Sequence, residues 1–214
     1  MKVDHNTKYL RNNYILEGYS SSSDVRVPSA DDPNILNTVN QTTAEKYFAS
    51  MRNEFKLNKK HSAMFLFSSY EDDRFSGFDY QASIAAGYAN RLFQYDRSHF
   101  DYRIGPGYSV AKEITVDNND VIIAEETIET AIVRVDLEYV FNITENAKFE
   151  QNVASEIATD SEKNTKTKSI SAISANINKS LALKAAFTIN YNDVVPAGKK
   201  QADTQSSFTL VYSF

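Results

Sequence analysis

The stretch Ala131–Phe141, which reads AIVRVDLEYVF, follows a period of two. Every odd position is apolar, whereas the charged residues Arg134, Asp136 and Glu138 all occupy even positions. Because successive side chains of a β-strand point to opposite faces, this pattern predicts a strand with one apolar and one charged face. The run is about twice as long as an ordinary globular strand, and it matches the roughly 9 to 11 residues that cross a bilayer.

The same period of two recurs along the whole chain. It is clear in residues 78–88, where Phe78 and Tyr80 share an apolar face opposite Asp79, and again in residues 181–191. Weaker runs lie near residues 9–19, 44–57, 61–70, 99–109, 147–158, 166–177 and 207–214. Strands that cross lipid must pair into a closed barrel, because lipid cannot satisfy an open edge. We therefore predict an all-β fold, an antiparallel transmembrane β-barrel with about ten strands in one domain, residues 1–214.

The predicted connections alternate between long and short. Long polar segments cover residues 20–42, 111–127 and 192–202, whereas residues 58–60, 93–97, 142–147 and 178–180 are short turns. This sorting is typical of outer membrane barrels, whose exterior loops are long and whose periplasmic turns are short. The alternative is a soluble β-barrel that binds an apolar ligand, but such a barrel would hold its large apolar side chains inside.

Composition excludes several other classes of protein. The chain is 42% hydrophobic but has no run of about 20 apolar residues, which excludes a helical membrane protein. The net charge is -5 and no Lys/Arg cluster is longer than a pair, so the sequence lacks the clustered positive charge of a nucleic-acid-binding protein. The absence of cysteine removes disulfides, thiolate chemistry and cysteine metal sites.

Charged residues on the polar faces of the strands form the main candidate site. In a narrow barrel these side chains would meet in the lumen and would have to pair, which predicts a salt-bridged plug. A narrow water-filled pathway is the alternative. With Glu150 and Glu156 included, acids exceed bases seven to five, so such a pathway would mildly prefer cations. The predicted network consists of Arg52, Glu54, Asp79, Arg91, Asp101, Arg103, Arg134, Asp136, Glu138 and Lys184.

Two further groups of residues, three carboxylates and three histidines, are candidate sites. The carboxylates Glu71, Asp72 and Asp73 could bind a divalent cation from an outer loop, since hard cations prefer oxygen ligands, or they could simply belong to a turn. The three histidines, His5, His61 and His99, have no nucleophile or metal-ligand spacing around them. We therefore expect no catalytic residue, no metal and no cofactor, and a protein that is not an enzyme.

Several motifs are similar to those of one bacterial family. They are TAEKY at residues 43–47, YEDDRFSGFDY at residues 70–80, GPGY at residues 105–108, Asp203-Thr204, and LVYSF at residues 210–214. Together they resemble the salt-induced outer membrane proteins, a family of unknown molecular function. The resemblance implies an outer membrane β-barrel of a Gram-negative bacterium, in contact with outer membrane lipid and lipopolysaccharide and inserted by the barrel assembly machinery. Tyr212 and Phe214 resemble the C-terminal signal read by that machinery, so deletion of Phe214 is expected to impair insertion more than stability.

The beginning of the chain departs from this family. Residues 1–6, MKVDHN, lack the apolar region of a signal peptide. Members of the family usually carry a signal peptide and about two further strands before the region that matches residues 9–20. The resemblance thus implies an N-terminally truncated chain and about twelve strands in the complete protein. The expected role is a non-enzymatic outer membrane component, structural or a narrow channel; a link to salt or osmotic stress rests on the name of the family alone.

Overall fold

The computed structural model describes residues 1–28, 36–57, 61–73, 77–116, 122–161, 163–178, 180–195 and 200–212. Among these residues, no helix has the length and apolar content that crossing a membrane requires. The strands are β1 (Lys2–Asn6), β2 (Leu10–Pro28), β3 (Leu36–Lys56), β4 (Ala63–Asp73), β5 (Phe78–Gln94), β6 (Ser98–Val116), β7 (Ile122–Asn142), β8 (Ala147–Ala158), β9 (Lys166–Asn176), β10 (Leu181–Asn192) and β11 (Ala202–Tyr212).

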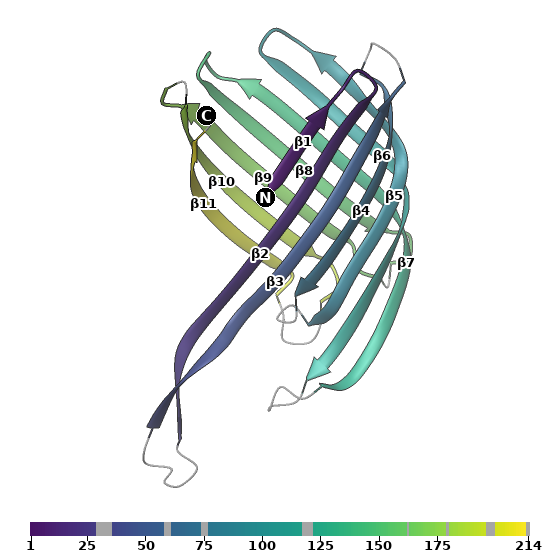
Figure 1. Ribbon diagram of the computed structural model, residues 1–214. Helices are drawn as coiled ribbons and strands as arrows, with labels where there is room; N and C mark the ends of the chain where they lie inside the picture. Colours follow the sequence, from purple (N-terminus) through teal and green to yellow (C-terminus); the bar gives the residue numbers. More distant parts are fainter. Residues whose placement is uncertain are drawn as a thin grey trace.

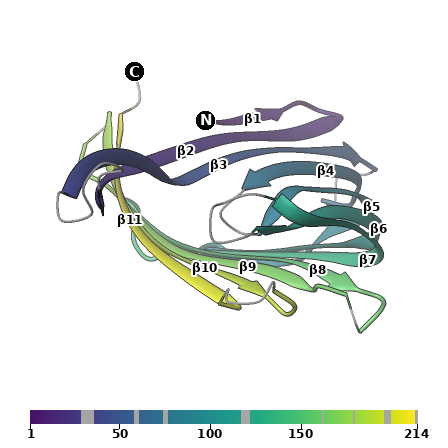
Figure 2. The same ribbon diagram turned by 90° about the horizontal axis from the view of Figure 1, so that it is seen from below.

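The strands form one eleven-stranded antiparallel sheet in which each strand pairs with its neighbours in sequence. The sheet curls around a common interior into an incomplete barrel, with β1 and β11 as its two edges (Figure 1, Figure 2). The predicted all-β, antiparallel barrel-like fold is confirmed. The short strand β1, which pairs with Arg11–Ile15 of β2, was not predicted and accounts for the eleventh strand.

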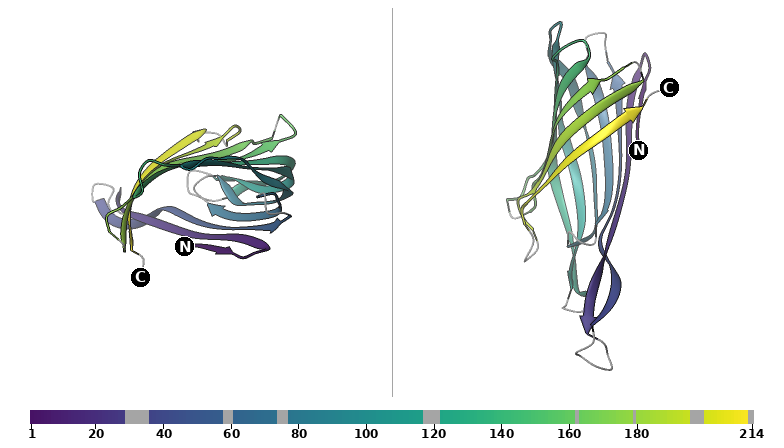
Figure 3. Two further views of the ribbon diagram at one scale, coloured as in Figure 1. Left: turned by 90° about the horizontal axis from the view of Figure 1, so that it is seen from above. Right: turned by 90° about the vertical axis from the view of Figure 1, so that its left-hand side faces the viewer.

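The long connections predicted at residues 20–42 and 111–127 are mostly strand, so that prediction was wrong. β2 and β3 stay paired as far as Pro28 and Leu36, and β6 and β7 stay paired as far as Val116 and Ile122. Figure 3 shows the β2–β3 hairpin projecting beyond the neighbouring strands. A projecting pair of strands does not cover a core, so its sequence needs no alternation of apolar and polar residues. A polar run such as Ser20–Asp24 therefore resembles a loop in the sequence.

The two faces of the sheet differ in polarity. In β7, Arg134 and Asp136 are buried on the inner face, whereas Phe141 is exposed on the outer face. Large apolar side chains are likewise exposed on other strands, as the following residues illustrate: Leu16, Phe55, Ile84, Ile104, Ile173, Phe187 and Leu210. The arrangement is the reverse of a water-soluble barrel, because the outer face is apolar and the inner face carries charge.

The inner face of β4 is the main exception to this polarity. Ala63, Phe65 and Phe67 are buried there and pack with Ala85 and Ala89 of β5 into a small apolar cluster. Buried aromatic side chains thus mark the β4 wall, whereas the buried charged side chains lie mainly on other strands.

Close packing of β5 against β6 explains the GPGY motif. A Cβ atom on Gly87 would lie 2.2 Å from the Ile104 carbonyl oxygen, and one on Gly105 would lie 2.1 Å from the Ala86 carbonyl oxygen. Real Cβ atoms do not approach backbone atoms so closely, so both positions require glycine. Pro106, which has no amide hydrogen, lies where the ladder between the two strands is interrupted.

A register shift at the start of β5 changes the face predicted for Phe78. Phe78 pairs with Asp73 and Glu113, and the register shifts before Tyr80 pairs with Lys112. Phe78 is consequently buried, at 7% exposure, although simple alternation predicts it on the exposed apolar face. Asp79 falls within the irregular segment, and such a bulge cannot be read from a period of two.

Candidate functional site

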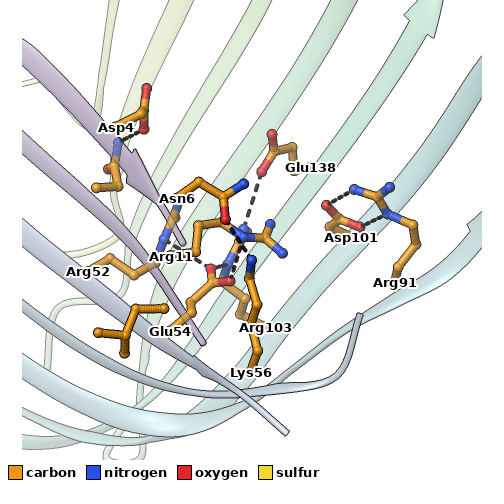
Figure 4. A network of polar contacts seen from close by, with 12 residues as sticks. Asp4, Asn6, Arg11, Arg52, Glu54, Lys56, Arg91, Asp101, Arg103 and Glu138 are labelled. Carbon is orange, nitrogen blue, oxygen red and sulfur yellow. Dashed lines mark hydrogen bonds and ion pairs between the residues drawn. The ribbon is translucent and has the colours of Figure 1, made fainter. Parts of the chain in front are cut away.

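Glu54 on β3 is the centre of a charge network inside the curled sheet (Figure 4). Its side chain is only 2% exposed. Arg103 Nε donates a hydrogen bond to Glu54 Oε1 at 2.6 Å, Arg52 Nε lies 3.4 Å from the same oxygen, and Arg11 Nε lies 3.3 Å from Glu54 Oε2. One carboxylate thus lies among three guanidinium groups from β2, β3 and β6.

The pairing of the strands and the alternation of side chains along each strand explain why these residues meet. Arg11 and Glu54 are partners in the β2–β3 ladder, and Arg52 lies two residues before Glu54 on the same face of β3. Arg103 comes from β6, which does not pair with β3, so its bond to Glu54 spans the interior. The network therefore ties together walls that the backbone hydrogen bonds leave separate.

The network continues toward β7 and β5. Arg103 Nη2 lies 3.4 Å from Glu138 Oε2. Arg91 makes a two-point contact with Asp101, from Nε to Oδ1 at 2.6 Å and from Nη2 to Oδ2 at 2.8 Å. A planar guanidinium that matches both oxygens of a carboxylate is the most specific geometry for such a pair.

A second cluster surrounds Arg134 in the middle of β7. Its guanidinium contacts both oxygens of Asp136 at 3.1 and 2.8 Å and donates to Glu156 Oε1 at 2.7 Å. The same Glu156 oxygen accepts a hydrogen bond from Ser83 at 2.7 Å, and Lys166 Nζ lies 3.3 Å from Glu156 Oε2. The Arg134 guanidinium carbon lies 3.4 Å from the centre of the Phe67 ring, a cation–π contact with the apolar wall.

These contacts are suited to holding strands together. The two clusters connect β2, β3, β5, β6, β7, β8 and β9, and their central side chains, Glu54, Arg103, Arg134 and Asp136, are buried. Charges removed from water are stable only when paired and hydrogen-bonded, as they are here. Both clusters are built from carboxylates and cations engaged with one another, a composition that supports cross-linking of the walls.

Eight of the ten residues predicted for the lumen network lie in one of the two clusters. The first holds Arg52, Glu54, Arg91, Asp101, Arg103 and Glu138, and the second holds Arg134 and Asp136. Asp79 is not among them: it lies 3.5 Å from Lys112 Nζ, which also contacts Glu125, at the end of the sheet where β5 begins. Lys184 makes no ion pair within the described ranges.

Four participants were missed from the sequence. Arg11 and Lys166 lie in runs whose alternation is weak or ambiguous, so their faces could not be assigned. Ser83 carries no charge to mark it, and Phe67 belongs to a strand whose inner face is apolar. The pairing of Arg11 with Glu54 in the β2–β3 ladder places Arg11 on the inner face, and no local pattern in the sequence signals the four residues.

The acidic motif at residues 71–73 ends a strand and does not form a loop. Glu71 and Asp73 lie on one face of β4, where Lys46 Nζ contacts them at 2.8 and 3.5 Å, whereas Asp72 points to the opposite face. In the part of the chain that the structure describes, no group of three or more His, Cys, Asp or Glu could hold a metal ion. A lysine thus occupies the place considered for a divalent cation.

The remaining predicted residues lie near strand ends. Tyr212 closes β11 with an exposed side chain, and Phe214 lies outside the described residues. His5 lies near Asn12, with 3.5 Å between His5 Nδ1 and Asn12 Nδ2, and His99 begins the β6 ladder opposite Gln94.

Comparisons with known proteins point to one family. The sequence profile described as "Protein of unknown function, DUF481" matches residues 2–214. The chain is 28% identical over 174 residues to "Uncharacterized protein YdiY" of Escherichia coli (strain K12), which covers 81% of this chain. The match spans 64% of the length of that relative. No solved structure matches the chain. Since the profile covers nearly every residue, the chain belongs to the DUF481 family of proteins of unknown function.

Proposed function

We propose that the protein is a non-enzymatic outer membrane β-barrel whose interior is closed, or reduced to a narrow ion pathway, by the charge network. The observation that carries this proposal is the pairing of Glu54 with Arg103 across the interior, with both side chains at 3% exposure or less. A wide aqueous pore would leave such charges solvated, and a ligand cavity would leave space where the ion pairs lie.

The polarity of the two faces supports a lipid environment. Apolar side chains such as Ile84, Ile104 and Leu210 are exposed on the outer face, where water would make a continuous apolar surface unfavourable. Antiparallel strands with an apolar outer band and a polar interior are the pattern of outer membrane barrels. In this setting the partners are membrane lipid, lipopolysaccharide and, during biogenesis, the barrel assembly machinery.

The soluble barrel with an apolar ligand is the competing function. It requires the large apolar side chains to line a cavity, yet most large apolar side chains are exposed on the outer face, and the buried rings of Phe65 and Phe67 are packed against Ala85 and Ala89. The charged residues on the remaining inner walls disfavour an apolar ligand.

Electrical recording in planar lipid bilayers tests the proposed function. We expect the purified protein to give either no current steps or only small ones. Large anion-selective steps would contradict a lumen closed by ion pairs. Fractionation of the native cells tests the location: recovery without detergent in the soluble fraction would support the soluble barrel.

A link to salt or osmotic stress follows only from the resemblance to salt-induced proteins. It predicts that transcript and protein levels rise when the growth medium is shifted to higher salt. Constant levels across that shift would remove this part of the proposal and leave the barrel and its closed interior unaffected.

A further inference from the structure

A pocket of about 640 Å³ opens at the short-turn end of the sheet, beside the Glu54 network. Its lining contains five basic residues and no acidic one, which is unusual in a chain whose net charge is -5. The lining residues are Asn6, Lys8, Tyr9, Arg11, Lys56, Leu57, His61 and Arg91.

The five basic residues come from five different strands or connections. Lys8 lies in the turn between β1 and β2, Arg11 begins β2, Lys56 ends β3, and Arg91 lies on β5. His61 lies between β3 and β4 with a positive φ of 68°, a conformation that non-glycine residues rarely adopt. Antiparallel pairing brings these positions to one end, where Figure 4 shows Lys56 and Arg11 beside the buried ion pairs.

Only two of these cations have carboxylate partners. Arg11 shares Glu54 with other arginines, and Arg91 is bound by Asp101. Lys56 Nζ instead donates to two neutral oxygens, Asn6 Oδ1 and the Thr7 carbonyl, both at 2.6 Å. Lys8 Nζ lies 5.2 Å from the centre of the Tyr9 ring. Within the described residues, neither lysine forms a salt bridge.

The adjacent network does not neutralise the pocket. It sets four arginines, Arg11, Arg52, Arg91 and Arg103, against three carboxylates, Glu54, Asp101 and Glu138, and so keeps one positive charge in excess. The buried Arg11 Nε atom lies 3.3 Å from Glu54 Oε2 but makes no well-aligned hydrogen bond in the described structure. An anion bound near Arg11 would add a charged acceptor for this guanidinium group.

We infer that this pocket binds a phosphate group, either free phosphate or the phosphate of an ester. The Lys56 ammonium group, held by two neutral oxygens, has a third N–H donor to spare, and Lys8 has no carboxylate partner among the described residues, an arrangement that suits a compact oxyanion. The exposed side chains of Tyr9 and Leu57 add apolar surface at the rim, so an organic part of a phosphate ester also has a place to pack. This inference does not depend on the proposed location, because free phosphate is available in any compartment.

Titration with inorganic phosphate at low ionic strength tests the inference on the detergent-refolded protein. The test variant is Lys8→Met with Lys56→Met, which keeps apolar stems of similar length and removes both charges. Lys148→Met is the matched control, because Lys148 lies in β8 near another short turn and pairs with Glu150 outside the pocket. The single variant Lys56→Arg keeps a positive charge at position 56 and should retain binding.

A second set of measurements separates free phosphate from a lipid headgroup. The same variants are reconstituted in phosphatidylcholine vesicles with and without phosphatidylglycerol, and retained lipid is identified by native mass spectrometry. We expect at least about tenfold weaker phosphate binding, or loss of phosphatidylglycerol retention, in the double lysine variant only. Binding of neither probe by the unmodified protein, or equal binding by the double variant, would overturn the inference.

Discussion

Glu54 and Arg103 lie 49 residues apart in sequence and on strands that do not pair, yet their side chains meet at 2.6 Å in the interior. Both are almost completely buried. The contact is the shortest link between the β2–β4 wall and the β6–β7 wall in the first cluster, and three of the predictions below concern it or the strands that carry it.

Removal of the central carboxylate should destabilise the protein strongly. Glu54→Ala leaves Arg11, Arg52 and Arg103 without their shared partner, and breaking a buried pair costs about 3–5 kcal/mol. The free energy of unfolding is measured by urea titration in detergent micelles. Glu150→Ala, which removes the more exposed pair with Lys148, should cost at most about 1 kcal/mol. Equal losses for the two variants would argue against a special role for Glu54.

The same network should limit ion flow. Replacing both Glu54 and Arg103 by alanine removes the charged bridge across the interior. Neither of its two charges is then left behind without the other. In planar bilayers we expect the double variant to give current steps several-fold larger than those of the unmodified protein. Removing Lys148 and Glu150 together should leave the recordings unchanged. Unchanged recordings for the Glu54 and Arg103 pair would show that the bridge does not obstruct the interior.

The β5–β6 contact should not tolerate a side chain. Gly105→Ala would drive its Cβ into the Ala86 carbonyl oxygen, at 2.1 Å, so the strands would have to separate. Overpacking of this kind costs about 1–3 kcal/mol or prevents folding. At Gly18 a Cβ atom would meet only the Tyr47 ring at 3.6 Å, an ordinary contact, so Gly18→Ala is the control. Both are compared by heat-induced mobility shifts in gels, and similar behaviour would count against the tight approach.

The exposed apolar face should not tolerate a charge if it meets lipid. Ile84→Arg would place a guanidinium in the apolar band, at a cost of about 2–4 kcal/mol near the bilayer midplane. We expect a lower yield of folded protein in lipid vesicles. Ser22→Arg, on an exposed part of the β2–β3 hairpin, should insert normally. Under the soluble-barrel alternative, Ile84→Arg would instead leave folding intact and improve solubility.

The sequence predicted the strands correctly where one face of the strand is buried and the other is exposed. The period of two in Ala131–Phe141 identified both faces of β7, and the structure keeps that phase. Predictions were wrong where burial does not set the pattern: β1 is short and fully exposed, the β2–β3 hairpin projects beyond the neighbouring strands (Figure 3), and a register shift turns Phe78 inward. None of these features leaves a signal with a period of two.

The candidate site was only partly predictable for a related reason. Alternation assigns a residue such as Arg103 or Arg134 to the inner face, but it does not say which side chains meet across the interior. Curvature of the sheet decides that Arg103 reaches Glu54 and that Arg134 covers Phe67. The same limit applies to Lys184, which shares the charge pattern but lies on a wall without a carboxylate partner in the described residues.

The contact between Gly87 and Gly105 also has a consequence for how this family can diverge. The obstacle facing each Cβ position is backbone, so no side-chain substitution elsewhere can make room for a larger residue at either glycine. Salt bridges, by contrast, can be exchanged for other well-packed pairs over evolutionary time. The two glycines are therefore expected to serve as fixed landmarks for aligning distant relatives whose interior charges have been replaced.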